Sequence, residues 1–446
     1  ILFSSIFYDW PIRIECMIFQ RLIYQSILWR GIYFVSVLGL NIMIARYYEA
    51  ADSGLIFFIT NSLALVVTIS SLSLESGIAY YIASGKAESF GLSNFAIAWS
   101  VVSTALIYLI LKILIFSEII QPFYSHYYFE TICYIGGCVL INFFTAVFYA
   151  ERDFFRPNII MSLVNLLLIL LMPFSEGYLI DQNQYTAIYF LGFLMQGLLV
   201  AGCFVLQNRK RWKIILPSKK TLLPVFRYAF KAFGANLLFF LLYRIDYWFV
   251  ERYCSSDDLG NYIQVSKLVH VFLVIPAIMA SAIFPISAGN NKDSARKSVL
   301  FLSRVITCCY IFISFILIAI GHWLFPFLYG NTFDNMYIPF LLLIPGIFFL
   351  SILNLLGAYF AGQNRVVLNI ICSALGLAVI IAGDIVFIPI KGIKAAALVS
   401  SMGYFVSLAF LIRMFARRYT LSLKELLVLQ KRDIRIIKGW LIHKFH

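Results

Sequence analysis

The chain has 446 residues, of which 62% are hydrophobic, 17% are aromatic and only 13% are charged. Soluble domains carry about 25% charged residues, so this chain has too few charges to build a water-facing surface. These values exclude an ordinary soluble enzyme. The net charge of +14 would suggest nucleic acid in a soluble protein. Here the basic residues lie mostly in loops and in the C-terminal tail, so we expect membrane lipids and no nucleic acid as partners.

The cysteines and histidines do not form a recognisable site. The eight cysteines contain no CxxC pair, and no histidine spacing suits a metal ion. Most of the cysteines fall in apolar blocks, where cysteine behaves as a small hydrophobic residue. We therefore predict neither a disulfide nor a bound metal.

Apolar blocks of nearly the length that crosses a bilayer, roughly 20 residues, recur along the whole chain. We predict an all-α polytopic membrane protein with about twelve spans. The spans are 23–46, 54–83, 93–116, 129–149, 158–180, 185–206, 229–251, 259–287, 299–325, 338–361, 366–389 and 393–416. Proline interrupts some of them, as at Pro276 and Pro285, which membrane helices tolerate where neighbours satisfy the freed backbone groups.

The loops between these spans differ sharply in charge. With the N-terminus inside, the inner segments carry 24 Lys and Arg residues, and the outer loops, counted with Arg46 and Lys394 at the adjoining span ends, carry 4. Positive loops stay in the cytoplasm, so we predict a bacterial inner-membrane protein with both termini cytoplasmic. No role is assigned to residues 1–16, which precede Met17.

The basic loop after the sixth span divides the chain, and a short repeat supports the division. Arg46-Tyr47 to Asp52-Ser53-Gly54 follows the first span, and Arg252-Tyr253 to Asp258-Leu259-Gly260 follows the seventh, at an offset of 206. Parallel repeats are typical of transporters with two lobes around a central site. The predicted parts are a cytoplasmic segment 1–22, an N-lobe 23–206, a linker 207–226, a C-lobe 227–416 and a basic amphipathic cytoplasmic tail 417–446.

Several short motifs resemble a known family. The first span opens with Trp29-Arg30-Gly31, and the seventh contains Phe233-Gly234-Ala235-Asn236 followed by Arg244-Ile245-Asp246-Tyr247-Trp248. With the repeat segments and Phe284-Pro285-Ile286-Ser287, the pattern resembles polysaccharide-biosynthesis flippases of the multidrug/oligosaccharidyl-lipid/polysaccharide exporter superfamily, of which O-antigen flippases are the closest type. The resemblance covers roughly residues 20–416.

The resemblance implies a fold and a function. It implies two six-helix lobes that form a V around a central cavity and alternate between inside-open and outside-open states. The implied cargo is an undecaprenyl-diphosphate-linked oligosaccharide repeat unit of O-antigen, lipopolysaccharide or a similar surface polysaccharide. By analogy, the polysaccharide polymerase and the chain-length regulator of the same pathway are expected partners.

Charged residues within the spans are the candidate site residues, because each costs roughly 2.5–3.5 kcal/mol or more at membrane depth. They are Arg30, Glu75, Lys231, Arg244, Asp246, Lys267, Arg304 and Asp384. We expect Arg30, Lys231 and Lys267 to bind the diphosphate of the cargo in the cavity. For Arg30 the alternative is snorkelling to the inner interface.

The acidic residues are candidates for ion coupling or for a cavity ion pair. Glu75 lies at a depth similar to that of Arg30, so it could pair with Arg30 or carry a proton. Asp246 and Lys267 should lie at similar depth on neighbouring helices, and we predict that they pair or share a site. No cofactor is expected beyond a proton or sodium gradient.

Helical phase separates the other charges of the seventh span. Lys231 and Asp246 are fifteen residues apart, which places them about 60° apart around one helix. Arg244 is about 200° from Asp246 and should snorkel outward or contact the other lobe. Arg304 is expected at the interface, and Asp384 is expected to pair with Lys391 or Lys394.

Three functions are compared with these observations. The cationic excess at depth favours a flippase for an anionic cargo over a multidrug or small-molecule cation antiporter of the same superfamily. A membrane enzyme of polysaccharide assembly, such as a polymerase, needs a sizeable outer loop, and the predicted outer loops are short. We therefore predict a transporter and no catalytic residues.

Overall fold

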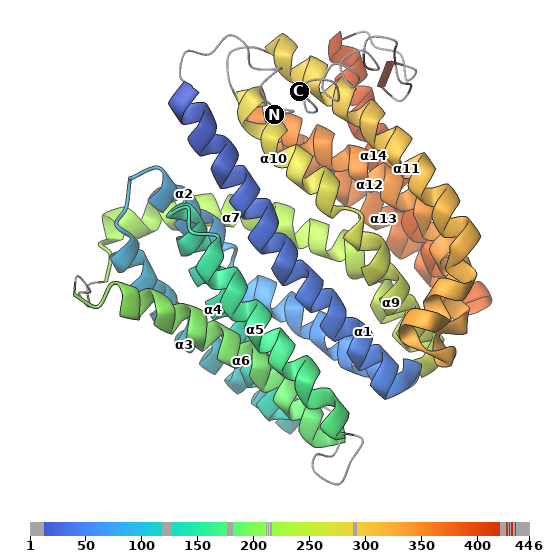
Figure 1. Cartoon of the computed structure of the whole chain (residues 1–446), viewed down its shortest axis with the longest axis horizontal. Helices are drawn as coiled ribbons and strands as arrows, with labels where there is room; N and C mark the ends of the chain where they lie inside the picture. Colours follow the sequence, from blue (N-terminus) through green and yellow to red (C-terminus); the bar gives the residue numbers. More distant parts are fainter. Residues whose placement is uncertain are drawn as a thin grey trace, which may run out of the picture. The chain divides into compact units, whose positions relative to one another are not determined.

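The computed structural model describes residues 13–117, 127–175, 182–210, 212, 214, 216–288, 292–419, 425–426, 428, 430 and 433. Within these residues the chain is helical and contains no strand, as predicted (Figure 1). Residues 1–12 of the predicted cytoplasmic segment and residues 434–446 of the predicted amphipathic tail fall outside the described residues.

The helices follow one another as a series of long apolar segments. They are α1 (Arg13–Ser71), α2 (Leu74–Ala83), α3 (Ser89–Phe116), α4 (Tyr128–Ala150), α5 (Phe155–Leu171), η2 (Met172–Ser175), α6 (Gln182–Gln207), α7 (Lys219–Arg244), α8 (Asp246–Tyr253), α9 (Ser256–Val271), α10 (Val274–Ala288), α11 (Lys292–Tyr329), η3 (Asn331–Met336), α12 (Tyr337–Gly362), α13 (Val366–Lys391) and α14 (Ile393–Tyr419).

The number of membrane spans agrees with about twelve. Nine helices in the described part of the chain are long and apolar enough to cross a bilayer, and the bent pair α9 and α10 makes a tenth. The segment Tyr24–Ser71 has 48 residues, about 70 Å of helix, which is more than twice the hydrocarbon thickness. Dividing it at its break, and adding the shorter α5, gives twelve. The chain is a multi-pass membrane protein.

The chain separates into two compact units. Unit 1 contains Tyr48–Leu55 and the described residues from Leu238 onward, and unit 2 contains Ile14–Tyr47 and Ile56–Leu237. The first part of α7 thus belongs to unit 2, although the predicted C-lobe begins at residue 227. The V-shaped arrangement of two lobes around a cavity stays a prediction.

The repeat found in the sequence marks a close contact inside unit 1. Helix α1 breaks at Glu49, whose φ of 61° and ψ of −175° are not helical. A Cβ on Gly54 would lie 2.7 Å from the Cα of Gly260, and a Cβ on Gly260 would overlap the carbonyl of Ala50. The last glycines of both repeat copies therefore meet, and neither position has room for a side chain.

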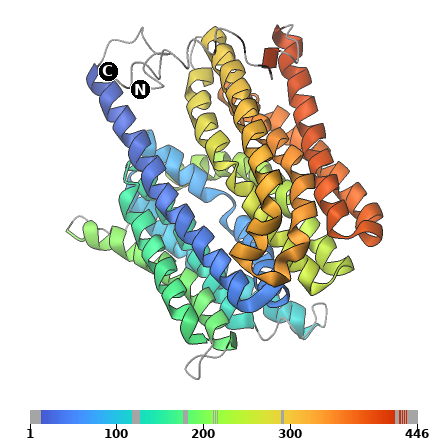
Figure 2. The ribbon, with the colours of Figure 1, turned by 45° about the vertical axis from the view of Figure 1, so that its right-hand side comes forward.

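Small residues also bring neighbouring helices together within each unit. In unit 2, a Cβ on Gly197 of α6 would lie 2.6 Å from the carbonyl oxygen of Gly137 in α4. In unit 1, a Cβ on Gly383 of α13 would lie 2.6 Å from Val399 of α14, and α11 to α14 run alongside one another (Figure 2). Association through small residues is typical of membrane helices, because lipid provides no hydrophobic force between them.

Large apolar side chains cover the outside of several helices. In α3, Val101, Val102, Leu106 and Ile113 are each more than half exposed. In α11 the same is true of Phe312, Phe315, Trp323 and Phe327. Exposed apolar faces of this size are rare on soluble monomers and suit contact with lipid.

Candidate functional site

A buried carboxyl begins helix α8 in unit 1. The long α7 ends at Arg244, and the turn at Ile245 separates it from Asp246, which is 2% exposed. One oxygen of Asp246, Oδ2, accepts hydrogen bonds from the hydroxyl of Tyr262 in α9 and, at 2.9 Å, from Ser400 in α14. The other oxygen, Oδ1, has no hydrogen-bond partner among the described residues.

A second buried carboxyl lies close enough to interact with the first. Asp384 of α13 is fully buried, and neither of its carboxyl oxygens has a hydrogen-bond partner in the described part of the chain. Its charge interacts with that of Asp246. We call Asp246 and Asp384 the acid pair. Burying an unpaired charge is strongly unfavourable, so two adjacent carboxyls require a cation or protons to compensate them.

One predicted ion pair of these carboxyls was wrong, and the other stays a prediction. Asp246 accepts hydrogen bonds from Tyr262 and Ser400, and its pairing or shared site with Lys267 stays a prediction. Asp384 does not bond to Lys391 or Lys394, both of which are exposed at the end of α13 and the start of α14. The burial of Asp246 thus agrees with its predicted place inside a span, whereas the partners predicted for Asp384 were wrong.

Three basic side chains gather on α7 and α9 in the same unit. Arg244 lies close enough to Lys267 and His270 for their charges to interact. The ring of Tyr243 lies 5.3 Å from that of His270, whose Nδ1 is 3.5 Å from the hydroxyl of Ser266. We call Arg244, Lys267 and His270 the basic cluster. Helical phase predicted Arg244 off the face of Asp246, and the structure places it close to Lys267.

Arg30 of α1 lies in unit 2 against an aromatic ring rather than against an acid. Its guanidinium is 4.4 Å from the ring centroid of Tyr149, and the side chain is exposed. The hydroxyl of Tyr149 donates a 3.0 Å hydrogen bond to Asn158. Neighbouring Trp29 packs edge-on against Phe155 at 4.5 Å.

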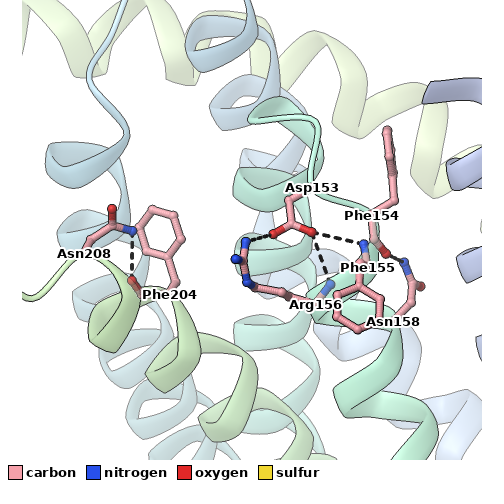
Figure 3. Close-up of polar contacts among 7 residues, drawn as sticks. All are labelled: Asp153, Phe154, Phe155, Arg156, Asn158, Phe204 and Asn208. Atoms are coloured by element: carbon pink, nitrogen blue, oxygen red, sulfur yellow. Dashed lines mark hydrogen bonds and ion pairs between the residues drawn. The ribbon is translucent and has the colours of Figure 1, made fainter. Parts of the chain in front are cut away.

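The corner between α4 and α5 fixes the surroundings of Arg30. Asp153 caps α5, because its Oδ1 accepts from the backbone N–H groups of Phe155 and Arg156 at 3.1 and 3.2 Å (Figure 3). Asp153 also forms an ion pair with Arg156, and Asn158 donates to the carbonyl of Phe154 at 2.7 Å. This network holds Tyr149 in place and leaves the guanidinium of Arg30 accessible.

Glu75 sits directly after a break in unit 2. Leu72 and Ser73 both have positive φ angles, 49° and 54°, and Trp99 donates to the freed carbonyl of Ser70 at 2.9 Å. One carboxyl oxygen of Glu75 is buried without a hydrogen-bond partner among the described residues. The expected pairing of Glu75 with Arg30 is not formed, since that oxygen is unbonded and Arg30 stacks on Tyr149.

A further buried charge, that of Arg304, forms an ion pair that was not predicted from the sequence. Arg304 of α11 is 7% exposed and forms two hydrogen bonds of 2.7 and 2.9 Å to the carboxylate of Asp433 in the tail. It also donates to the carbonyl of Glu425 at 2.7 Å. Arg304 is thus buried and paired, and its expected place at the membrane interface stays a prediction.

Comparison with known proteins identifies the family of this chain. Residues 43–338 match the family model described as polysaccharide biosynthesis protein. The chain belongs to this family. No curated protein matches it.

Solved structures share the fold of this family member at low sequence identity. It is similar to an inward-facing multidrug resistance MATE family transporter of the MOP superfamily, with 14% identity, a TM-score of 0.66, and 87% of this chain and 96% of that chain covered. It is similar to the lipid II flippase MurJ in an inward closed conformation, with 17% identity, a TM-score of 0.67, and 94% and 92% covered. It is also similar to the Vibrio cholerae MATE transporter VcmN in its bent form, with 14% identity, a TM-score of 0.63, and 89% of this chain and 96% of that chain covered. At this level of identity the matches show a shared fold.

Proposed function

We propose that the chain is a flippase that moves an undecaprenyl-diphosphate-linked oligosaccharide across the bacterial inner membrane by alternating access. The observation that carries the proposal is the family match over residues 43–338 together with a transporter fold. A member of a polysaccharide family that has a transporter fold is best explained by transport of a polysaccharide precursor. O-antigen or lipopolysaccharide repeat units are the cargo that the sequence resemblance favours.

The basic cluster supports an anionic cargo. Arg244 and Lys267 lie close together within unit 1, and like charges at close range repel each other. A diphosphate that contacts both side chains offsets this repulsion, and a guanidinium can bind phosphate oxygens in a bidentate way. Arg30 in unit 2, exposed over Tyr149, is a further guanidinium that can bind an anionic group.

We infer that the acid pair couples transport to a proton or sodium gradient. Asp246 Oδ1 and both oxygens of Asp384 are buried and unbonded, so they can accept a small cation without first breaking a hydrogen bond. The hydroxyls of Tyr262 and Ser400 complete an all-oxygen surrounding. Oxygen ligands suit hard cations rather than soft transition metals, and the described residues hold no cluster of three or more His, Cys, Asp or Glu.

The charge of the predicted loops supports an orientation with both termini in the cytoplasm. In that orientation the flippase takes its cargo from the cytoplasmic leaflet and delivers it outside. The polymerase and the chain-length regulator are then the proposed consumers of its product, by analogy with the family.

The decisive experiment deletes the gene in its host and measures lipid-linked oligosaccharide separately in each leaflet. We expect loss of surface polymer, with complete repeat units accumulating in the cytoplasmic leaflet. Complementation by Asp246→Asn should fail. Glu75→Gln tests the second coupling candidate in the same assay. The amount of lipid-linked oligosaccharide in each leaflet is compared between variants at equal protein abundance.

Two other outcomes would contradict the proposal. Normal surface polymer with altered susceptibility to drugs or dyes would favour a multidrug antiporter. Lost polymer with repeat units already in the outer leaflet would favour a polymerase-type enzyme.

A further inference from the structure

The first part of α7 extends beyond the hydrocarbon core. The span that contains α7 covers 35 residues, Lys219–Tyr253, or about 50 Å of helix. The hydrocarbon core is about 30 Å thick, so roughly two fifths of this helix lies at the level of the lipid headgroups or in water. The exposed Lys219, Lys220, Arg227 and Lys231 place that part at the N-terminal end, because charges avoid the bilayer centre.

Two tyrosines stack face to face at this level in unit 2. The rings of Tyr80 in α2 and Tyr228 in α7 have centroids 4.7 Å apart and planes inclined by only 7°. Each tyrosine is still 41% exposed. The ammonium of Lys86 lies 5.2 Å from the centroid of Tyr80 and 3.4 Å from its hydroxyl, which is the range of a cation–π contact.

Close packing of α2 on α7 holds the stack rigidly. A Cβ on Gly77 would lie 2.8 Å from the carbonyl oxygen of Val225, so the two backbones approach as closely as glycine allows. Ser73 lies one turn before Gly77, and its hydroxyl accepts a 3.0 Å hydrogen bond from the side chain of Asn236 in α7. The break at Ser73 and the glycine therefore set the position of Tyr80 against Tyr228.

Cations flank the stack on α7. Lys231 is three residues beyond Tyr228 and four beyond Arg227, so the three side chains are neighbours on the helix surface. Arg227 and Lys231 are both exposed. The arrangement combines a half-exposed aromatic ring with cations one turn away, at the depth of the headgroups.

We propose that Tyr228, supported by Tyr80 and Lys86, binds the first sugar of the cargo, while Lys231 and Arg227 bind its diphosphate. The occupant is the headgroup of the polyprenyl-diphosphate sugar, and this inference rests on the proposed function. A sugar ring presents C–H groups to the electron-rich face of an aromatic ring, and the diphosphate offers its charge to both cations. The site receives the headgroup at the membrane surface.

The stack distinguishes this occupant from ordinary anionic phospholipid. Interfacial tyrosines that serve only as anchors need one hydroxyl among the headgroups and no partner ring. Here a second tyrosine and a lysine cover one side of the assembly, and Tyr228 keeps part of its surface exposed. A flat aromatic surface next to cations fits a sugar attached to a diphosphate better than a phosphodiester alone.

The test measures lipid binding to the full-length protein in nanodiscs by native mass spectrometry. The probes are undecaprenyl diphosphate carrying one N-acetylhexosamine, undecaprenyl diphosphate without sugar, and phosphatidylglycerol. Tyr228→Ala should weaken binding of the sugar-bearing lipid by about tenfold and leave the sugar-free lipid unchanged, because only the stacking contact is lost. Lys231→Ala should weaken both diphosphates. Tyr228→Phe should bind normally, since the ring remains.

Tyr253→Ala is the matched control, because Tyr253 is also exposed at a helix end and lies outside this stack. Equal binding by Tyr228→Ala and Tyr253→Ala would overturn the inference while leaving the proposed function intact. Equal weakening of all three lipids by Tyr228→Ala would show an interfacial anchor only. Failure of the unmodified protein to bind or translocate the sugar-bearing lipid would overturn the proposed function, and the inference with it.

Discussion

Two groups of buried charged residues in unit 1 differ in their hydrogen-bond partners. Arg304 and Asp433 satisfy each other with two hydrogen bonds, and Gln430 adds a backbone N–H to Asp433 at 2.8 Å. Asp246 and Asp384 are equally buried, yet three of their four oxygens have no hydrogen-bond partner among the described residues. A charge that is fully paired contributes to structure, whereas buried acids without partners persist where function requires them.

The difference also separates what each group can do. The ion pair joins residues 129 positions apart in the sequence and has no capacity left for a ligand. The acid pair joins α8 and α13 and retains that capacity. Removing a charge should therefore have opposite effects on folding stability at the two places.

The largest effect is expected for Arg304→Ala. Removing the guanidinium leaves the carboxylate of Asp433 buried without a partner, which costs about 3–5 kcal/mol. The free energy of unfolding measured by SDS titration in detergent micelles should fall by that amount. Replacing both residues, as Arg304→Met with Asp433→Leu, should recover most of the loss because no unpaired charge remains. A loss below about 1 kcal/mol for Arg304→Ala would show that water hydrates the carboxylate of Asp433, as at an exposed ion pair.

Asp384→Asn should act in the opposite sense. It removes a buried charge next to Asp246, so the free energy of unfolding should stay the same or rise. Coupling between an ion and a cargo is typically worth 1–3 kcal/mol, so the ion-stimulated rate of lipid translocation in proteoliposomes should fall by about 5–150-fold.

The exposed Asp334 of η3 provides the matched control for Asp384→Asn. Asp334→Asn makes the same chemical change and should alter neither stability nor the ion dependence. If Asp384→Asn transports normally with an unchanged response to the gradient, the acid pair is not the coupling site.

The helices and buried acids of this comparison could be predicted from the sequence, but the partners of these acids could not. Apolar blocks predicted the membrane helices, and the repeat predicted related positions for Gly54 and Gly260, which touch in the structure. The partners of Asp246 lie 16 and 154 residues away, on α9 and α14. Periodicity orients side chains around one helix but does not give the rotation of one helix against another, so these contacts could not be found.

Helical phase gave an expectation that the structure does not test. The predicted angle between Lys231 and Asp246 concerns two residues that lie in different units. Asp384 was assigned to nearby lysines, although an acid inside a 26-residue apolar helix is by default a candidate for function. Asp433 was overlooked because the tail was judged by its excess of basic residues.

Tyr262→Phe should produce a smaller change than Asp384→Asn. The variant removes one of the two donors to Asp246 Oδ2 and preserves the buried ring, which packs edge-on against Tyr247 at 5.9 Å. A hydrogen bond to a charged group contributes about 1.5–3 kcal/mol, part of which Ser400 retains here. Because the hydroxyl competes with a cation for the same oxygen, half-maximal transport should occur at a lower cation concentration. A higher required concentration would mean that the hydroxyl of Tyr262 itself binds the ion.

Ser400→Ala should have the smallest effect and should identify the ion. Its hydroxyl donates to Asp246 at 2.9 Å, and its loss is worth about 1 kcal/mol. In a proton-coupled protein the hydroxyl of Ser400 is no ligand of the ion. Its loss removes a hydrogen bond to the ionised carboxylate, so the variant should bind the proton slightly more tightly. Sodium needs several oxygen ligands, so in a sodium-coupled protein the required sodium concentration should rise a few-fold.

Ser407→Ala on the same helix removes a comparable 2.9 Å bond to the carbonyl of Cys372 and is the control for stability alone. Identical ion dependence in both serine variants would remove Ser400 from the site and leave the two carboxyls to bind the ion without it.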